Sequence, residues 1–318
     1  MSTPLVSIIC TAYNHEQYIK RCLDGFMMQK TTFNFEVVIN DDASTDNTAA
    51  IIKQYESKYP EIIIPIYQKE NQYSKKEGIW RTILFPRARG KYIAICEGDD
   101  YWTDPLKLQA QVAFLETHND YILVCGGFQA ILPTGETRDE IIRSIVPPDQ
   151  EDDQGFTFTL RDLNKTWFTK TLTSLFRNIP ELKSYNSKYN YSRDIHLFHS
   201  LLTAGHGYYL KKVLGVYNMH EGGIFSLKSR QEKIITHYYI YKDMYEKSPD
   251  SYTRKEYLGL SQELLNYKIS RRIRNKEIKT KILVMTIIRL AKSKYEIIYS
   301  LKCLVPMQVK RLFARDIT

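Results

Sequence analysis

The sequence lacks the features by which secreted and membrane-embedded proteins are recognised. It contains only 5 cysteines among 318 residues, without a CxxC pair and without regular spacing. Three of them, Cys10, Cys96 and Cys125, lie within apolar, strand-like runs, where a reduced cysteine behaves as a small hydrophobic residue. Because disulfides persist in oxidising compartments, this pattern favours a reducing compartment.

Long apolar runs are also missing. The best candidate, ILVMTIIRL at residues 282–290, is much shorter than the roughly 20 residues that span a bilayer, and it contains Arg289. The opening stretch MSTPLVSIICTAYN lacks the basic segment and the cleavage site of a signal peptide. The sequence therefore predicts a cytoplasmic protein that is not integral to a membrane.

Four widespread functional motifs are absent as well. There is no GxGxxG dinucleotide loop, no GxxxxGK[ST] phosphate loop, no HExxH zinc helix and no GxSxG nucleophile turn. Any nucleotide or metal chemistry must therefore use other residues.

The chain does show a regular alternation of two patterns. Apolar, β-branched runs predict strands, and stretches with apolar residues at helical spacing predict helices between them. The predicted strands cover residues 5–13, 35–41, 62–68 and 91–98, and the predicted helices residues 16–29, 48–59 and 105–118. This order predicts an α/β fold with an open, mostly parallel sheet and helices on both faces. After residue 120 the pattern loosens, and residues 207–220 suggest a hairpin.

Acidic clusters follow two of the predicted strands. The first is NDDASTD at residues 40–46, and the second is EGDDYW at residues 97–102. In open α/β sheets, ligands bind beyond the carboxyl ends of the strands. The first cluster also fits a turn that leads into a helix N-cap. Alternatively, a carboxylate there, such as Asp41, can accept from a base imide or a ribose hydroxyl.

The second cluster indicates a ligand-binding site more strongly than the first. Glu97, Asp99 and Asp100 repel one another unless a cation or a strong donor lies among them. Hard oxygen ligands suit Mg²⁺ or Mn²⁺, which keep several waters and bridge substrate phosphates. Gly98 lets a ligand approach the backbone closely. We therefore expect a divalent-metal and diphosphate site, with a surface turn held by ion pairs as the alternative.

Three segments together resemble a known family. VSIICTAYNHEQYI, VVINDDASTDNT and YIAICEGDDYWTDPLKLQAQVAFLE look like the nucleotide-sugar half of family 2 glycosyltransferases, which have the GT-A fold. The resemblance is specific over about residues 4–118 and weaker to about residue 227. It implies an inverting hexosyl- or N-acetylhexosaminyltransferase that uses a nucleoside-diphosphate sugar, most simply a UDP-sugar. The absence of a QxxRW motif and of membrane spans indicates a non-processive enzyme that adds one sugar.

The resemblance also implies roles for single residues in the donor site. Asp41 would lie near the base, Asp99 would be the principal metal ligand of a DxD-like motif, and Asp100 beside it would be a further metal ligand. Glu97 stands where the family often has Asp, and its longer side chain should still reach base, ribose or a metal-bound water. The strand end that would line the nucleotide pocket consists of Thr11, Ala12 and Tyr13.

Two residues further along match later positions of the family. Asp194 matches the catalytic base that takes the proton of the acceptor hydroxyl, and it also fits a helix N-cap. His220 lies in a segment that resembles the late loop near the diphosphate, where it would be a metal ligand; the alternative is a structural histidine.

We expect a catalytic domain at residues 1–230, with a nucleotide-sugar half at about 1–120 and an acceptor half at about 121–230. Residues 231–318 form a Tyr-rich, helical extension with 19 Lys and Arg against 9 Asp and Glu. One helical stripe there could consist of Val284, Ile287, Ile288, Ala291, Tyr295 and Ile298.

The basic extension has several interpretations. It could dock on the catalytic domain, form a homodimer, or attach to the anionic inner face of the plasma membrane, where each well-placed Lys or Arg contributes about 1 kcal/mol. Membrane attachment would suit a polyprenyl-diphosphate-linked glycan acceptor in capsule, O-antigen or exopolysaccharide biosynthesis, as the resemblance implies. No nucleic-acid-binding module is recognisable, so we expect no nucleic-acid partner.

Two rival functions make different predictions. A sugar-nucleotide pyrophosphorylase should carry a Gly-rich phosphate loop after the first strand, where this chain has TAYNHEQY. In a non-catalytic basic scaffold or nucleic-acid-binding protein, Asp99→Ala would leave metal-dependent nucleotide binding unchanged, and salt would govern any polyanion affinity.

Overall fold

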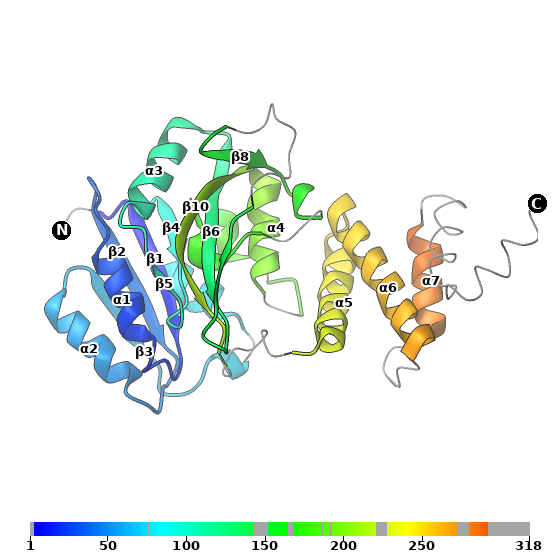
Figure 1. The fold of residues 1–318 in the computed structure, drawn as a ribbon, viewed down its shortest axis with the longest axis horizontal. Helices are drawn as coiled ribbons and strands as arrows, with labels where there is room; N and C mark the ends of the chain where they lie inside the picture. Colours follow the sequence, from blue (N-terminus) through cyan, green and yellow to red (C-terminus); the bar gives the residue numbers. More distant parts are fainter. Residues whose placement is uncertain are drawn as a thin grey trace, which may run out of the picture. The chain divides into compact units, whose positions relative to one another are not determined.

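Alternating strands and helices build the larger part of the computed structural model of this chain (Figure 1). The structure describes residues 3–75, 77–142, 152–164, 168–185, 187–190, 193–220, 228–271 and 280–291. Two compact units, Met1–Gly223 and Ile224–Thr318, divide the chain, and each is described by itself below.

The first unit is built on one sheet. Its strand order is β3-β2-β1-β4-β9-β6-β10-β5, with β7 paired to β6 and β8 paired to β10. The strands are β1 (Val6–Ala12), β2 (Phe35–Asp41), β3 (Ile63–Tyr67), β4 (Tyr92–Ile95), β5 (Tyr101–Trp102), β6 (Tyr121–Ile131), β7 (Thr137–Glu140), β8 (Gly155–Phe158), β9 (Leu175–Arg177) and β10 (His206–Asn218).

The four strands predicted from the first third of the sequence are confirmed. β3, β2, β1 and β4 run parallel, so β2 and β4 end at the same edge of the sheet. β6 and β10 are also parallel, whereas β5, β7, β8 and β9 pair antiparallel with their neighbours. Both acidic clusters therefore follow strands that end at one edge, as the sequence predicts.

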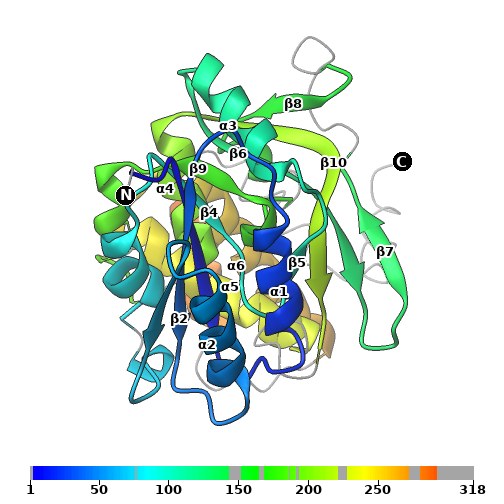
Figure 2. The same cartoon turned by 90° about the vertical axis from the view of Figure 1, so that its left-hand side faces the viewer.

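Helices cover both faces of this sheet. The longer ones are α1 (Ile19–Met27), α2 (Thr48–Lys58), α3 (Lys107–Thr117) and α4 (Asp194–Ala204). Figure 1 and Figure 2 show α1 and α2 on one side of the sheet and α4 on the other. The short helical turns are η1 (Tyr73–Lys75), η2 (Trp80–Leu84), η3 (Phe85–Arg87), η5 (Asp162–Asn164), η6 (Thr171–Thr173) and η7 (Pro180–Lys183).

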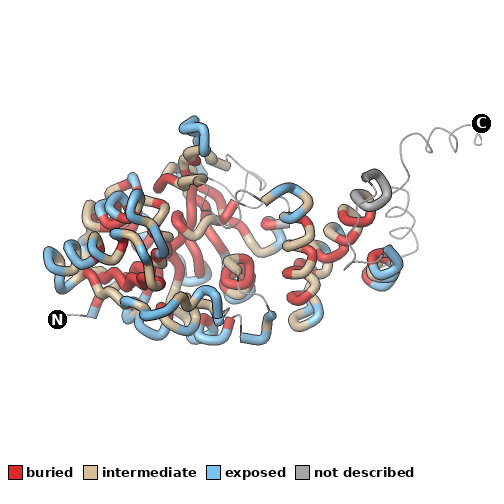
Figure 3. Tube along the Cα trace, turned by 90° about the horizontal axis from the view of Figure 1, so that it is seen from below, coloured by how far each residue is buried: buried red, intermediate tan, exposed pale blue. Residues whose placement is uncertain are grey.

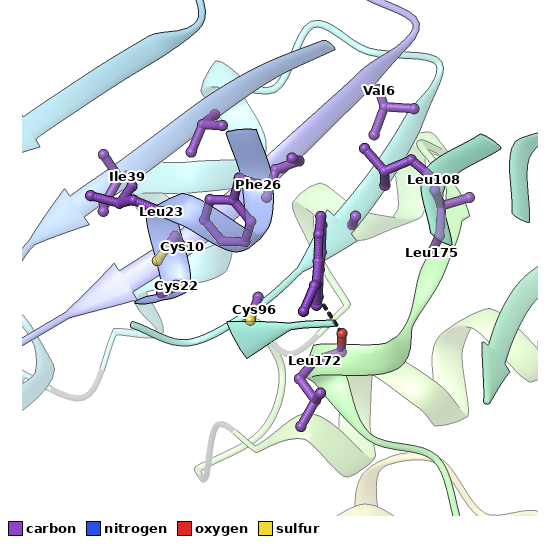
Figure 4. Close-up of a cluster of buried hydrophobic side chains, with 14 of the residues drawn as sticks. Val6, Cys10, Cys22, Leu23, Phe26, Ile39, Cys96, Leu108, Leu172 and Leu175 are labelled. Carbon is purple, nitrogen blue, oxygen red and sulfur yellow. Dashed lines mark hydrogen bonds between the residues drawn. The ribbon is translucent and has the colours of Figure 1, made fainter. Parts of the chain in front are cut away.

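The core lies between the sheet and its helices, and the sheet strands are buried along most of their length (Figure 3). Cys10, Cys22 and Cys96 come from β1, α1 and the end of β4 and meet in this core (Figure 4). All four cysteines within the described residues are free and buried, as expected for reduced thiols. Cys303 lies outside the described residues.

Trp102, the last residue of the second acidic cluster, packs in the core. Its indole Nε1 donates a 2.7 Å hydrogen bond to the Leu172 carbonyl in η6, and its ring packs against Phe26 (Figure 4 shows this hydrogen bond). The buried Lys107 ammonium lies 4.1 Å from the Trp102 ring centroid and donates to Gln111 Oε1. Gln111 in turn donates to the Thr173 carbonyl, so η6 is fixed from two sides.

Two local predictions are wrong. Residues 207–220 do not form a hairpin, because β10 runs as one strand along β6 with three register shifts that absorb its irregular apolar pattern. α3 begins at Lys107 rather than at Pro105. Asp104 accepts from the Leu106 amide and pairs with Lys212, which keeps residues 104–106 out of the helix.

The second unit consists of α5 (Arg230–Lys247), α6 (Ser251–Arg271) and α7 (Thr280–Leu290). Ser229 caps α5 through a reciprocal capping box with Glu232. Tyrosines fill the space between α5 and α6, where the Tyr241 and Tyr252 hydroxyls share a 2.8 Å hydrogen bond. Within the described ranges, no helix combines the length and apolar character that a bilayer crossing requires.

The predicted apolar stripe of the extension is only partly right. α7 buries Leu283, Ile287 and Leu290, while Ile288 is exposed. Tyr295 and Ile298 of that stripe lie outside the described residues.

Candidate active site

The end of β1 and the turn after it form one wall of the candidate site. The Thr11 carbonyl accepts from the Gly98 amide at 2.9 Å, Ala12 is buried, and Tyr13 is exposed. The next residue, Asn14, has a φ of 55°, and its side chain accepts from the Thr45 amide at 2.8 Å. The β1 turn is thereby tied to the first acidic cluster.

Asp41 lies at the end of β2 with one oxygen that has no partner. The residue is 3% exposed, and its Oδ1 is buried without a hydrogen-bond donor. Burial raises the pKa of Asp41, against hydrogen bonds from Ser44 that lower it. The neighbouring Ala43 has a φ of 62°, a left-handed conformation that costs energy for a residue with a side chain. A buried acceptor without a donor fits the N–H of a ligand such as a base imide.

Glu97 lies two residues after the end of β4 and contacts η6. Thr171 Oγ1 in η6 donates to Glu97 Oε2 at 2.9 Å. Desolvation and the nearby Asp99 carboxylate raise the pKa of Glu97 to about 7, with a smaller contribution from Asp194, while the Thr171 hydrogen bond opposes the rise. Its second oxygen, Oε1, is not used in that hydrogen bond.

Asp99 faces two histidines. His220 Nε2 lies 3.0 Å and His15 Nε2 4.0 Å from Asp99 Oδ2. Burial alone would raise the pKa of Asp99, but the His220 hydrogen bond and the charge of His15 hold it below its usual value. The same hydrogen bond raises the pKa of His220, whereas burial lowers that of His15. The Tyr18 ring lies 4.8 Å from the His220 ring.

A divalent ion fits this arrangement. Two ligands at about 2.1 Å and at right angles around an octahedral ion lie about 3 Å apart, which matches the Asp99 Oδ2–His220 Nε2 distance of 3.0 Å. No group of three or more potential ligands is gathered among the residues that the structure describes. Mg²⁺ and Mn²⁺ commonly use few protein ligands because waters and substrate phosphates complete the shell. Asp99 and His220 are therefore the residues that would hold the ion.

Asp100 points away from this pair. Its Oδ1 accepts from the Asn218 amide of β10 at 2.9 Å, and the residue is 3% exposed. Burial and the charges of Asp99 and Glu97 raise its pKa, and Lys170 opposes the rise. The structure gives Asp100 a partner in the main chain, and its role as a metal ligand stays a prediction.

Asp194 reaches the same site from α4. It is the first residue of the helix and Arg193 is the N-cap, so the N-cap alternative for Asp194 is not what the structure shows. Its Oδ1 accepts from the adjacent Ile195 amide at 2.9 Å. The Asp194 carboxylate is close enough to raise the pKa of both Glu97 and Tyr217. The charge of Asp194 therefore acts on Glu97, and the role of Asp194 as the base stays a prediction.

Sequence reasoning missed four side chains around these carboxylates. His15 and Tyr18 lie in NHEQY after the first strand, where an aromatic and basic turn at a strand end was the available signal. Lys170 and Tyr217 offered no comparable signal. The Lys170 ammonium lies 4.6 Å from the Tyr217 ring centroid and 5.5 Å from that of Phe128, on the acceptor half.

The sheet thus carries carboxylates after β2 and β4, a buried Asp41 oxygen without a donor, and the Asp99–His220 pair. The sequence profile of glycosyl transferase family 2 matches residues 7–185, more than half of the chain. The chain belongs to glycosyl transferase family 2.

Curated relatives match about a third of the chain. The uncharacterised protein Rv1520 of Mycobacterium tuberculosis is 49% identical over 113 residues, which cover 36% of this chain and 32% of that protein. The Escherichia coli UDP-Glc:α-D-GlcNAc-diphosphoundecaprenol β-1,3-glucosyltransferase WfaP is 38% identical over 113 residues, or 36% of this chain and 42% of WfaP. The matches span less than half of either relative.

Solved structures share the fold over nearly the whole chain. Residues 1–349 of Staphylococcus aureus TarS, in complex with UDP-GlcNAc, give a TM-score of 0.62 at 19% identity and cover 94% of this chain and 87% of that one. The mannosyltransferase PcManGT of Pyrobaculum calidifontis, in complex with GDP-Man and Mn²⁺, gives a TM-score of 0.53 at 14% identity and covers 99% and 88%. The expected GT-A fold is thereby confirmed.

Proposed function

We propose that this protein is an inverting, metal-dependent glycosyltransferase that moves one sugar from a UDP-sugar to a glycan acceptor. The observation that supports the proposal is the position of Asp41 and Glu97 after strands that end at one edge of the sheet, with His220 on Asp99. The Asp194 carboxylate contributes to the raised pKa of Glu97. Membership of family 2 and the UDP-GlcNAc complex of TarS support a nucleotide-sugar donor.

Each side chain has one task in this proposal. Asp41 accepts from the base through its unpaired Oδ1, and Glu97 offers Oε1 to the ribose while Thr171 holds Oε2. Thr11, Ala12 and Tyr13 line the nucleotide pocket. Asp99 and His220 hold the divalent ion, Mn²⁺ or Mg²⁺, which neutralises the departing diphosphate when bound. Asp100, the third predicted ligand of the ion, accepts from the Asn218 amide of β10.

Asp194 acts as the general base. It takes the proton of the acceptor hydroxyl as that oxygen attacks the anomeric carbon, and the bond from that carbon to the diphosphate oxygen breaks. Its place at the start of α4, across from Glu97, supports attack from the acceptor half. The product has the inverted configuration because attack and departure occur on opposite faces of the sugar.

The proposed acceptor is a lipid-linked glycan. WfaP acts on a diphosphoundecaprenol-linked sugar, and this supports a polyprenyl-diphosphate-linked glycan in bacterial surface polysaccharide assembly. We assign catalysis to residues 1–230, with the acceptor half at about 121–230, at the cytoplasmic face of the membrane.

Titration calorimetry with UDP tests the donor site directly. We expect wild-type protein to bind UDP with Mn²⁺ at least about tenfold more tightly than without it, and Asp99→Asn to lose this difference. Asp153→Asn, which changes an exposed carboxylate away from the sheet edge, is the matched control and should bind as wild type. Equal UDP affinity with and without Mn²⁺ in wild type would refute metal-dependent donor binding.

A further inference from the structure

α7 has apolar side chains on two faces, and α6 covers only one of them. Leu283, Ile287 and Leu290 are buried on the covered face. Polar contacts fix this packing, since Arg254 of α6 donates to the Leu290 carbonyl and the Tyr257 and Thr286 hydroxyls lie 3.4 Å apart.

The second face carries three large apolar side chains in solvent. Ile282 is 45%, Met285 56% and Ile288 43% exposed. Their spacing of three residues places them along one side of the helix. The described residues contain seven large, exposed apolar side chains, and three of them lie on this one 11-residue helix. A cluster of this kind marks a contact surface, whereas single exposed apolar residues are ordinary.

Positive charge flanks this face. Lys281 and Arg289 are exposed on α7 itself. The sequence from residue 268 to residue 294 contains one acidic residue, Glu277, and ten basic residues: Lys268, Arg271, Arg272, Arg274, Lys276, Lys279, Lys281, Arg289, Lys292 and Lys294. We therefore expect the partner of this face to combine an apolar region, which contacts the three side chains, with negative charge around it, which pairs with the basic residues.

We propose that the exposed face of α7 docks on an anionic lipid bilayer, with Ile282, Met285 and Ile288 buried at the boundary between head groups and acyl chains. An amphipathic helix of this kind lies in the plane of the interface, and its apolar contact and its basic charges add to the binding. α7 is 11 residues long and contains Arg289, so it lies on the bilayer rather than crossing it.

A second copy of the chain fits this face less well. A two-fold contact through Ile282, Met285 and Ile288 would bring Lys281 and Arg289 of both copies toward each other, with no acidic residue on α7 to offset them. Anionic lipid head groups neutralise the same charges.

Co-sedimentation of the full-length protein with vesicles tests the proposal. The probes are vesicles of phosphatidylcholine alone and vesicles with added phosphatidylglycerol. We expect wild-type protein to sediment with the anionic vesicles and to stay in solution with the neutral ones. The variant Ile282→Asn/Met285→Asn/Ile288→Asn should partition onto anionic vesicles at least about tenfold more weakly, with an unchanged melting temperature because all three side chains are exposed.

Two further variants separate the contributions. Lys281→Gln/Arg289→Gln should weaken binding to anionic vesicles, and the binding that remains should depend less on salt concentration. Leu106→Asn, which removes a similarly exposed apolar side chain in the first unit, should bind as wild type. The proposal would be overturned if wild-type protein bound neither kind of vesicle, or if the triple variant bound anionic vesicles as tightly as wild type. It would also be overturned if sedimentation velocity showed a dimer of the wild-type protein and a monomer of the triple variant. These readouts do not depend on UDP, so they fail or succeed independently of the proposed transferase activity.

Discussion

Thr171 Oγ1 donates a 2.9 Å hydrogen bond to Glu97 Oε2, across 74 positions of sequence. The bond joins η6 to the end of β4, where the carboxylates that we propose bind the donor lie. η6 is itself fixed by Trp102 and by Gln111, so the orientation of Glu97 depends on the packing of both halves.

Replacing Thr171 by valine should weaken UDP binding. The change keeps the shape of the side chain and leaves Glu97 Oε2 without its donor, which costs about 1–3 kcal/mol of folding stability. Because Glu97 is then no longer held in place for the nucleotide, we expect UDP affinity to fall by about tenfold. Calorimetry with UDP and Mn²⁺ measures this. Thr171→Ser keeps the hydroxyl and should bind as wild type; equal affinities of the valine variant and wild type would show that Glu97 does not contact the nucleotide.

Asp194→Asn should abolish turnover and spare donor binding. Loss of a general base lowers kcat by about 10²–10⁴-fold, because the amide cannot take the proton of the acceptor hydroxyl. The measurement is sugar transfer to a lipid-linked acceptor extract, together with UDP affinity for the same variant. A kcat within about threefold of wild type would assign the base to another residue.

His220→Ala should weaken manganese binding in the presence of UDP by about tenfold or more, because it removes one of the three predicted protein ligands. Electron paramagnetic resonance of free Mn²⁺ reports the bound fraction. His206→Ala is the control, since His206 is exposed at the opposite end of β10. If both variants bind Mn²⁺ like wild type, His220 only hydrogen-bonds to Asp99.

Gly98→Ala should destabilise the protein and disturb the donor site. A Cβ at this position would lie 2.9 Å from Ile19 Cδ1 and 3.0 Å from His15 Nδ1, closer than packed side chains approach. We expect a loss of about 1–3 kcal/mol in the free energy of unfolding, measured by urea denaturation. Ile19→Val removes the clashing methyl group, so Gly98→Ala should cost less in that background than in wild type. An equal cost in both backgrounds would place the strain elsewhere.

Glu256 makes stability depend on pH. Burial in the second unit raises the pKa of Glu256 to about 7, above its unfolded value of about 4.3. The unfolded state therefore loses its proton first, and folding stability falls as the pH rises from about 4.3 to about 7. Glu256→Gln removes this loss and should stabilise the protein at pH 8, by at most about 4 kcal/mol, and hardly at pH 4.

Thermal melts of the second unit within the intact chain check this. Glu263→Gln changes a more exposed glutamate on the same helix, paired with Arg230, and should shift the melt little at either pH. A Glu256→Gln effect that is the same at pH 4 and pH 8 would contradict the raised pKa.

The sequence was most informative where local pattern decides the structure. Four strands with strict apolar runs, and carboxylates at the ends of two of them, were predictable because a buried parallel strand needs that composition. The contact of His15 with Asp99 was not, because it joins residues 84 positions apart on two different strand ends. His220 was predicted near Asp99 only through the family resemblance, since its approach over 121 positions depends on how β10 passes the edge of the sheet. Likewise, the three register shifts of β10 come from its pairing with β6 and leave no local signature.

Because Cys10, Cys22 and Cys96 are buried together, their reaction with a thiol reagent reports local unfolding of the elements that carry them. These thiols are fully buried and come from β1, α1 and the end of β4. An alkylating reagent can reach them only when those elements separate, and burial raises the pKa of Cys22 and Cys96, which keeps them unreactive until then. The labelling rate of the native protein therefore measures local unfolding next to the proposed donor site. A bound nucleotide that holds the strand ends together would lower this labelling rate.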